Sequence, residues 1–187
     1  IFIFSNSVSA GEDASKSNPP IRSASEISYP PFCMVDRDEE AYGFSVDLMR
    51  AALSAMGREV TFRTGQWADV KRWLELGEVQ ALPLVGRTPE REPIFDFTFP
   101  YMSFHGAIVV RKGTTGIENI EGLRGRQVAV MKGDNAEEFL RREDRGFEIH
   151  TTATFEAALR ELSHGRHDAV VIQRLVALRI IRESSFT

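Results

Sequence analysis

The sequence feature that most restricts the fold is an alternation of short apolar runs with segments that have helical spacing. The runs with strand character are 21–27, 60–63, 79–85, 108–110, 128–131, 148–151 and 168–172. The segments with helical spacing are 45–56, 67–76, 134–142, 154–163 and 175–181. Strands that alternate with helices predict mostly parallel sheets covered by helices. We therefore expect an α/β protein.

A weak internal similarity suggests that this pattern is built twice. Residues 73–85 align with residues 161–173 at one fixed offset, so that Gly77 matches Gly165 and Leu84 matches Ile172. The similarity indicates two α/β lobes of like design, although any helix–strand unit needs a glycine stop and an apolar strand. Ligands of open parallel sheets bind beyond the carboxyl ends of the strands. We expect a cleft between the lobes, with Gly86 on one wall and Gln173 on the other.

Composition excludes several classes of protein. The chain has 187 residues, 42% of them hydrophobic, and a formal net charge of −4, so it has no electrostatic basis for nucleic-acid binding. Cys33 is the single cysteine, and the four histidines do not combine with it into a metal-ligand pattern. His164 and His167 are expected to be solvated residues of a turn. We predict no metal and no cofactor.

The first ten residues, IFIFSNSVSA, end in the small-residue spacing that signal peptidase accepts. We interpret residues 1–10 as the remnant of a secretory signal peptide, and residues 11–20 as a flexible linker. The alternative is a disordered tail or one added for expression. The first interpretation predicts a periplasmic or extracytoplasmic protein.

The stretch from Gly86 to Arg91 carries the clearest site. Thr88 is a favourable N-cap and Pro89 suits the first helical position, so a helix is expected to start here. A helix N-terminus favours an anion, and Arg91 adds a planar fork that matches a carboxylate. The sequence therefore predicts an anion-binding corner directly after a buried strand.

An alternative is that Arg91 forms only surface ion pairs with neighbouring carboxylates. Those carboxylates are Glu90, Glu92 and Asp96.

Five motifs in order resemble the bacterial extracellular solute-binding proteins of family 3. The motifs are Tyr29–Phe32, Gly43–Leu48, Thr88–Arg91 with Phe97–Tyr101, Leu123–Val130 with Gly133, and Gly165–Val171. The resemblance implies the type 2 periplasmic-binding-protein fold, in which two hinged lobes close over a small polar ligand. Lobe 1 is expected at 21–110 and lobe 2 at 111–187, and the family's return segment to lobe 1 is expected to be missing.

The resemblance also implies roles for individual residues. Arg91 matches the arginine that grips the α-carboxylate of the ligand, and Tyr29 or Phe32 matches an aromatic that packs on the ligand. Trp67 is expected to add a second wall, with packing in the core as the alternative.

Two positions depart from the family pattern. Gln173 stands where members that bind amino acids commonly have an aspartate for the ammonium group of the ligand. Asp134 stands where threonine or serine is common, and it either caps a helix or supplies the missing negative charge. Both departures put an ordinary amino acid as ligand in question, because a buried ammonium group needs a charged partner.

The resemblance implies reversible binding of a small carboxylate-bearing solute, an amino acid or an organic acid. We favour the sensor input domain of a membrane-embedded signalling receptor, such as a histidine kinase, over a free binding subunit that works with an ABC permease. A third alternative is an enzyme, because some relatives are dehydratases or peptidoglycan lyases. Glu90 and Asp134 are the carboxylates that we would nominate for acid–base chemistry, but we expect no catalytic residue.

Overall fold

The computed structural model describes residues 18–184, which divide into two compact units. The first unit contains residues 18–27, 32–65 and 69–101, and the second contains residues 28–31, 66–68 and 102–184. The expected signal remnant at 1–10 and most of the expected linker lie outside the described residues.

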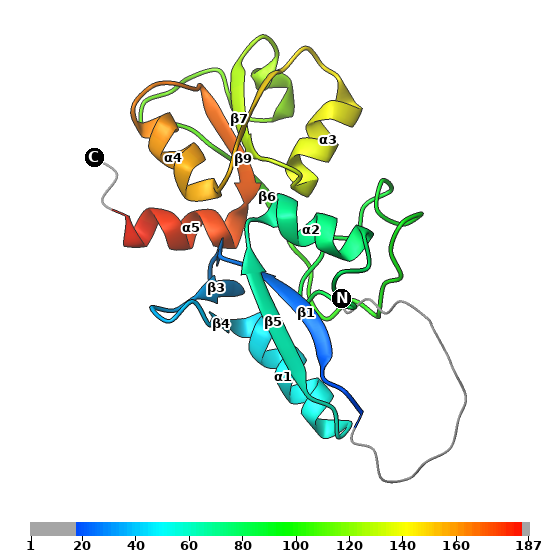
Figure 1. Cartoon of the computed structure of the whole chain (residues 1–187). Coiled ribbons are helices and arrows are strands. Elements are labelled where there is room, and N and C mark those ends of the chain that lie inside the picture. The colour runs from blue at the N-terminus through cyan, green and yellow to red at the C-terminus, as the bar shows by residue number, and fades with distance from the viewer. Residues whose placement is uncertain (1–17, 185–187) are drawn as a thin grey trace. The chain divides into compact units, whose positions relative to one another are not determined.

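The first unit is built on a parallel pair of strands covered by a helix (Figure 1). Its elements are β1 (Ile21–Glu26), β3 (Cys33–Val35), β4 (Ala41–Tyr42), α1 (Phe44–Ala55), β5 (Val60–Gly65) and most of α2 (Trp67–Glu75), which begins in the second unit. Strand β1 pairs with β5 from Ile21↔Val60 onward, and β3 pairs with β4 in antiparallel fashion. Met49 and Leu53 of α1 pack against this sheet to form the core.

The apolar run 79–85 was predicted as a buried strand, and this prediction was wrong. The run is largely buried, but it makes only an isolated bridge, from Ala81 to Ser23. Pro83 explains the difference, because proline has no N–H to donate to a strand ladder. The run therefore crosses the core of the first unit as irregular backbone.

Helix α1 begins differently from the prediction. Its N-cap is Gly43 and not Ser45. Gly43 has a φ of 117°, which glycine adopts readily because it has no side chain. Ser45 is fully buried, and its Oγ lies 2.9 Å from the hydroxyl of Tyr101. The serine is therefore part of a polar contact in the core.

The second unit holds a mixed four-stranded sheet in the order β6-β9-β7-β8. Its elements are β2 (Ser28–Tyr29), β6 (Gly106–Val109), the 3₁₀ turn η1 (Ile120–Leu123), β7 (Gln127–Met131), α3 (Asn135–Glu143), β8 (Glu148–Thr152), α4 (Phe155–Ser163), β9 (Ala169–Gln173) and α5 (Arg174–Glu183). Strand β7 is parallel to both β8 and β9, and β6 is antiparallel to β9. Helices α3 and α4 contact the sheet, and α5 packs beside α4 (Figure 1).

After the short stretches 28–31 and 66–68, the chain enters the second unit for the last time at residue 102. Residues 102–110, which were expected in lobe 1, lie here because β6 forms its ladder with β9, from Gly106↔Gln173 to Val109↔Val170. Leu123, Val128 and Leu140 are completely buried in the core of this unit.

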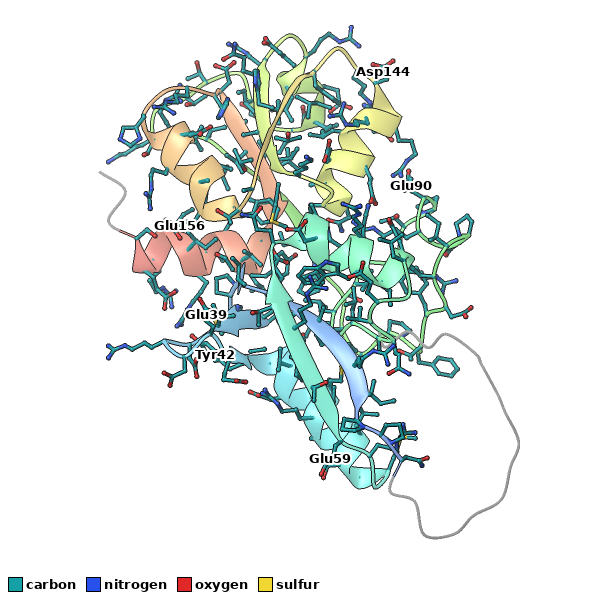
Figure 2. The ribbon with its side chains drawn as sticks, in the orientation of Figure 1. Glu39, Tyr42, Glu59, Glu90, Asp144 and Glu156 are labelled. Carbon is teal, nitrogen blue, oxygen red and sulfur yellow. The ribbon has the colours of Figure 1, made fainter. Side chains whose placement is uncertain are left out.

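Two helix starts of the second unit follow the prediction. The carboxylate of Asp134 accepts a hydrogen bond from the N–H of Ala136 at 2.8 Å, and the hydroxyl of Thr154 accepts one from Ala157 at 3.2 Å. Asp144 is the C-cap that follows α3 (Figure 2). It has a left-handed φ of 38°. Among residues 18–184, no helix is long and apolar enough to cross a bilayer.

Candidate functional site

The segment from Thr88 to Phe95 forms a run of turns. The N–H groups of Arg91 and Glu92 both donate to the carbonyl of Thr88, at 3.1 and 3.0 Å. Residues 89–94 are turn residues, so the predicted helix start was wrong. Pro93 gives the reason, since it cannot donate the next helical hydrogen bond and it restricts the residue before it.

Arg91 is buried in this turn. Its side chain is 3% exposed, and NH1 donates to the carbonyl oxygen of Gly86 at 3.2 Å. The carboxylate of Glu92 instead lies 2.6 Å from Nε of Arg87, and both of these side chains are about half exposed. An exposed ion pair of this segment is therefore made by Arg87, and the burial of Arg91 does not fit the alternative in which Arg91 forms only surface ion pairs.

Phe32 lies among aromatic side chains of the first unit. It is 4% exposed, and its ring meets that of Phe44 edge-on, with 6.5 Å between the ring centroids. Phe44 also contacts Tyr101, whose hydroxyl donates to the carbonyl of Pro83 at 2.8 Å. Burial raises the pKa of Tyr101 to about 12, against the opposing effect of its bond with Ser45, so the phenol is neutral over the physiological range.

Cys33 lies next to Phe32 and is also buried. Burial, together with the nearby negative charge of Glu26, raises the pKa of the Cys33 thiol to about 12. A thiol without thiolate character is a poor nucleophile. The cysteine is therefore a packing residue of the first unit.

In the second unit, Gln173 and Asn135 are in direct contact. Gln173 ends β9 and is 6% exposed, and its Nε2 donates to Oδ1 of Asn135 at 3.1 Å. Asn135 begins α3 directly after the cap residue Asp134, which is also 6% exposed. The ends of two neighbouring strands, β7 and β9, thus place Asp134 and Gln173 at one edge of the parallel part of the sheet.

Trp67 belongs to the same edge of the second unit. Its indole Nε1 donates to the carbonyl of Gly133 at 2.7 Å, and its side chain is 6% exposed. The N–H of Gly133 donates to the carboxylate of Glu137 at 2.6 Å. Both backbone groups of Gly133 are therefore engaged by side chains.

Tyr29 packs against the core of the second unit. The residue is 7% exposed, and its ring lies 6.1 Å from that of the fully buried Phe155, at an angle of 44°. Its role toward a ligand stays a prediction.

The structure joins the expected residues in two groups, one in each unit. Gly86, Thr88 and Arg91 share the turn of the first unit, and Phe32 lies apart from them in sequence, at the start of β3. In the second unit, Trp67 meets the turn that leads to Asp134, while Gln173 meets Asn135. Sequence reasoning missed Asn135, and its only signal was its position directly after a cap residue.

The histidines of the second unit form no metal site. His167 was expected to be solvated, which was wrong, since it is 8% exposed and its Nε2 lies 2.7 Å from Oε2 of Glu161. Within the described residues, no group of three or more potential ligands could hold a metal ion.

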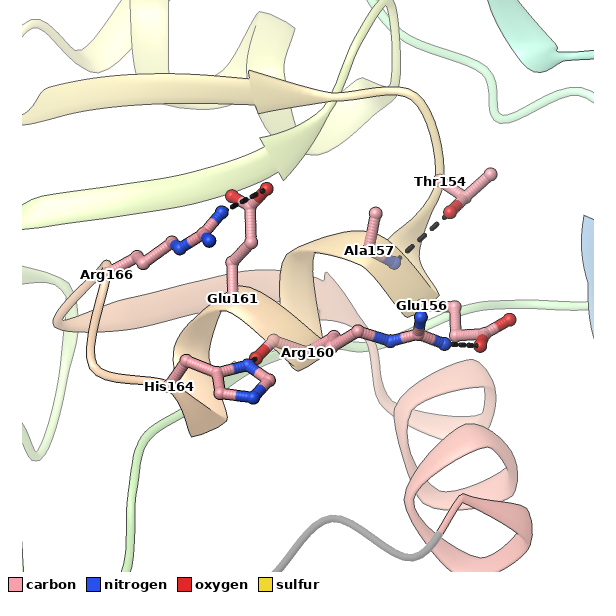
Figure 3. A pocket seen from close by; sticks show the side chains of 7 residues that line it. All are labelled: Thr154, Glu156, Ala157, Arg160, Glu161, His164 and Arg166. Atoms are coloured by element: carbon pink, nitrogen blue, oxygen red, sulfur yellow. Dashed lines mark hydrogen bonds and ion pairs between the residues drawn. The ribbon is translucent and has the colours of Figure 1, made fainter.

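A hollow of about 350 Å³ lies beside helix α4 (Figure 3). Its charged side chains are paired with one another: Arg160 contacts Glu156 at 2.6 Å, and Arg166 lies 3.8 Å from Glu161. Nδ1 of His164 donates to the carbonyl of Arg160 at 2.8 Å. The hollow is therefore a solvated helix surface with its charges balanced.

Comparison with known proteins gives a family match over most of the chain. The profile of the bacterial extracellular solute-binding proteins, family 3, matches residues 21–162. The family resemblance and the two-lobed α/β fold predicted from the sequence motifs are thereby confirmed.

Individual relatives are solute-binding proteins and a sensor domain. The chain is 29% identical to the L-cystine-binding protein TcyJ of Escherichia coli K12 over 164 residues, covering 87% of this chain and 62% of that protein. It is 32% identical to the putative ABC transporter arginine-binding protein 2 of the same strain, over 80% of this chain and 61% of that protein. A solved histidine kinase sensor domain with similarity to periplasmic binding proteins has 30% identity and a TM-score of 0.86, covering 91% of this chain and 75% of that one. The chain thus spans about three fifths of the curated relatives that it matches.

Proposed function

The chain belongs to family 3 of the bacterial extracellular solute-binding proteins, and on that premise we propose that it binds a small carboxylate-bearing solute reversibly. The solute is an amino acid or an organic acid, and no covalent chemistry takes place. Relatives whose names refer to cystine and arginine support this class of ligand.

The burial of Arg91 is the observation that carries the proposal. A guanidinium cannot lose its proton, so a buried arginine keeps its positive charge inside the unit. The contact of Nη1 with the carbonyl oxygen of Gly86 holds the side chain within the turn. The planar fork binds carboxylates through parallel hydrogen bonds, which lysine cannot reproduce. We assign Arg91 to the carboxylate of the solute.

The other expected residues have supporting parts in this proposal. Gly86 and Thr88 hold the turn that carries Arg91, through the carbonyl oxygens described above. Tyr29, Phe32 and Trp67 supply aromatic surface, and Asp134 and Gln173 supply polar groups. Six of the expected residues are less than one tenth exposed. Phe32 and Arg91 belong to the first unit, and the second unit holds Tyr29, Trp67, Asp134 and Gln173.

Isothermal titration with L-arginine, L-cystine and L-glutamate tests the assignment. We expect at least one of these probes to bind the wild type, and Arg91→Ala to lose that binding. Arg91→Lys is expected to retain only part of it, because it keeps the charge and loses the fork. Arg87→Ala is the matched control, since it removes an exposed arginine of the same segment.

Two results would contradict the proposal. One is that none of the probes and no other amino or carboxylic acid binds the wild type. The other is that Arg91→Ala binds as tightly as the control.

Among the roles within the family, we propose the sensor input domain ahead of the importer subunit. The solved sensor domain, with 30% identity over 91% of this chain, supports this choice. Sequencing the gene beyond Thr187 tests it. A transmembrane helix followed by a kinase or cyclase module supports the sensor, whereas a stop codon next to transporter genes supports the importer.

Closure of the lobes on the ligand stays a prediction. A ligand that prefers a closed state shifts the population toward that state by its difference in affinity. Small-angle scattering with and without a bound probe measures this. An unchanged radius of gyration at saturation would argue against closure.

The enzyme alternative would depend on Glu90 or Asp134 as acid or base. Asp134 already has a structural role, because its carboxylate caps α3. Incubation of the purified protein with each bound probe, followed by mass spectrometry of the solute, is expected to show no conversion. Conversion that disappears in Asp134→Asn would establish catalysis instead.

A further inference from the structure

Helix α5 of the second unit is apolar on both of its sides. One side packs on β6, β9 and α4, and its buried side chains are Val176, Ala177 and Ile180. The other side carries Leu175, Leu178 and Ile181, which are 54, 51 and 41% exposed. These three residues follow one another at intervals of three, so each is a neighbour of the next on the helix surface. The exposed side of α5 therefore has a continuous apolar stripe.

The same side of α5 is basic. The helix contains three arginines and one glutamate, which gives it a net charge of +2. Arg179 forms an ion pair with Glu183. Arg174 and Arg182 are exposed, and neither forms an ion pair with another described residue. Each lies four residues from Leu178 and therefore next to it on the helix surface. We call residues 174, 175, 178, 181 and 182 together the α5 face.

A hollow of about 500 Å³ adjoins the α5 face at Ile181. Its apolar lining consists of Val109, Val110, Leu159, Leu162 and Ile181. Arg111 and Lys112 also line it. The guanidinium of Arg111 is held by the carbonyl oxygens of Leu162 and His167, whereas Lys112 is exposed. An apolar hollow with two cationic groups in its lining suits a hydrocarbon chain that ends in an anionic group.

The charges of this surface distinguish between possible occupants. Two α5 faces brought together would place arginines against arginines, and like charges in an interface are unfavourable. Anionic lipid head groups would instead complement Arg174, Arg182 and Lys112. A helix with an apolar stripe beside basic residues lies in the interface of a bilayer, with its apolar side chains at the boundary between head groups and acyl chains. The charge and the apolar stripe thus point to the same occupant.

We propose that the α5 face docks on the surface of a bilayer that contains anionic phospholipids, and that the adjoining hollow takes one acyl chain of such a lipid. The helix lies in the plane of the surface, where Leu175 and Leu178 leave water and the basic side chains meet lipid phosphates. All the groups involved belong to the second unit. The inference therefore goes beyond the proposed function and needs no solute.

Sedimentation with unilamellar vesicles, without any solute, tests the docking. One set of vesicles consists of phosphatidylcholine alone, and the other contains phosphatidylglycerol as roughly a third of the lipid. We expect binding to the anionic vesicles to be at least about tenfold tighter, because each basic residue near an anionic surface contributes about a factor of five. Raising the salt concentration from about 0.05 to about 0.5 M should weaken this binding, since salt screens the attraction.

Two double variants separate the apolar and the charged parts of the face. Leu175→Ser with Leu178→Ser is expected to weaken binding to anionic vesicles by about tenfold or more, because two side chains no longer leave water. Arg174→Gln with Arg182→Gln is expected to weaken it by about tenfold or more and to leave binding to phosphatidylcholine unchanged. All four side chains are exposed, so the fold should tolerate both changes.

The matched controls lie in the first unit. Leu76→Ser removes a leucine that is 59% exposed, and Arg87→Gln removes an exposed arginine. Both are expected to bind vesicles as the wild type does.

Methyl spectra of the protein on anionic nanodiscs test the hollow. A nitroxide on the acyl chain is expected to broaden the methyl signals of Val110, Leu159 and Ile181, which line the hollow. The methyl signals of Leu53, in the core of the first unit, should stay sharp. Sharp signals from all three lining residues on nanodiscs that bind the protein would contradict an acyl chain in the hollow.

Three results would overturn the docking itself. The first is equal binding to both kinds of vesicle, or double variants that bind as the controls do. The second is self-association that the leucine double variant abolishes, without binding to vesicles, which would assign the face to a second copy of the chain. The third is binding of monomeric lysophosphatidylglycerol but not of vesicles, which would assign it to a free amphiphile. Because no solute is present, failure of the proposed function would leave these measurements unchanged.

Discussion

The two units hold their candidate residues in opposite ways. The first unit places Arg91, which has donors only and a permanent charge, on a run of turns without regular secondary structure. The second unit places Gln173, which leaves an acceptor, where a parallel strand passes into a helix. The Arg91 guanidinium is held by a carbonyl oxygen of its own short turn. The Gln173 amide is held by Asn135, which belongs to another secondary-structure element. The difference teaches that a charged group can be positioned by its own segment, whereas the orientation of a neutral amide is set by a partner that the fold supplies.

The largest expected effect compares the two residues directly. Arg91→Ala is expected to weaken binding of a carboxylate probe by roughly 2–5 kcal/mol, because it removes one partner of a charge-assisted pair. Gln173→Ala is expected to cost only about 0.5–1.5 kcal/mol, as for a neutral hydrogen bond. Titration calorimetry of both variants measures the difference. A larger loss in Gln173→Ala would reverse the assignment of the carboxylate.

The next effect concerns alkaline pH and the first unit. The Cys33 thiol has a pKa raised from 9.0 to about 12, and the phenol of Tyr101 is shifted in the same direction. Their contribution to stability is complete below the unfolded pKa values and is lost as the pH rises toward the folded ones. For Cys33 the loss amounts to roughly 1.4 kcal/mol per pH unit above pH 9.

Denaturant unfolding between about pH 8 and about pH 10.5 tests this loss. Cys33→Ala is expected to lose less stability over this range than the wild type does. Tyr42→Phe, at an exposed ring, is the control and is expected to behave like the wild type. If the free energy of unfolding fell equally with pH in the wild type and in Cys33→Ala, the raised pKa of the buried thiol would be contradicted.

A smaller effect is expected at the helix caps of the second unit. Asp134→Ala and Thr154→Ala should each lower the free energy of unfolding by about 1 kcal/mol, because each exposes an unpaired N–H at a helix start. Asp134→Asn keeps an acceptor, so it should retain most of the stability. Urea unfolding measures all three variants. An equal loss in Asp134→Asn would show that the charge, and not the cap bond, is what matters.

The smallest effect is expected in the hollow beside α4. Arg160→Ala breaks an exposed ion pair with Glu156, one turn away on the same helix, and it should cost less than about 0.5 kcal/mol. Arg87→Ala, which breaks an exposed pair in the first unit, should cost a similar amount. Urea unfolding at low and high salt measures both. A loss above about 1 kcal/mol in Arg160→Ala, twice the expected maximum, would mean that the hollow has a structural role.

Most elements were predictable because their signals are local. The caps Asp134 and Thr154 lie where the sequence placed them, since a short polar side chain before an apolar periodic segment competes for the first N–H groups of the helix. The parallel strands β7 and β9 were also expected, because fully buried strands read as continuous apolar runs.

The failures fall where prolines interrupt a favourable pattern. Pro83 turned an apparent strand into irregular backbone, and Pro93 stopped an apparent helix after its first hydrogen bonds. In both places the sequence pattern correctly predicted a buried segment, but it did not predict the backbone hydrogen bonding of that segment. The sequence shows that each proline lacks a backbone N–H donor. Whether this loss ends a strand or a helix depends on which carbonyl oxygen would have accepted the hydrogen bond, and the sequence does not show that.

The sequence by itself determined that the chain is an α/β protein of a solute-binding family, with an arginine in a Thr-Pro-Glu-Arg corner, because hydrophobic period, caps and motifs are properties of neighbouring residues. Only the tertiary structure decided that this arginine is buried on a turn and that Asn135 holds Gln173 with its oxygen unpaired. Residues 135 and 173 are far apart in the chain, and the direction of an amide is set by the partner that folding brings to it.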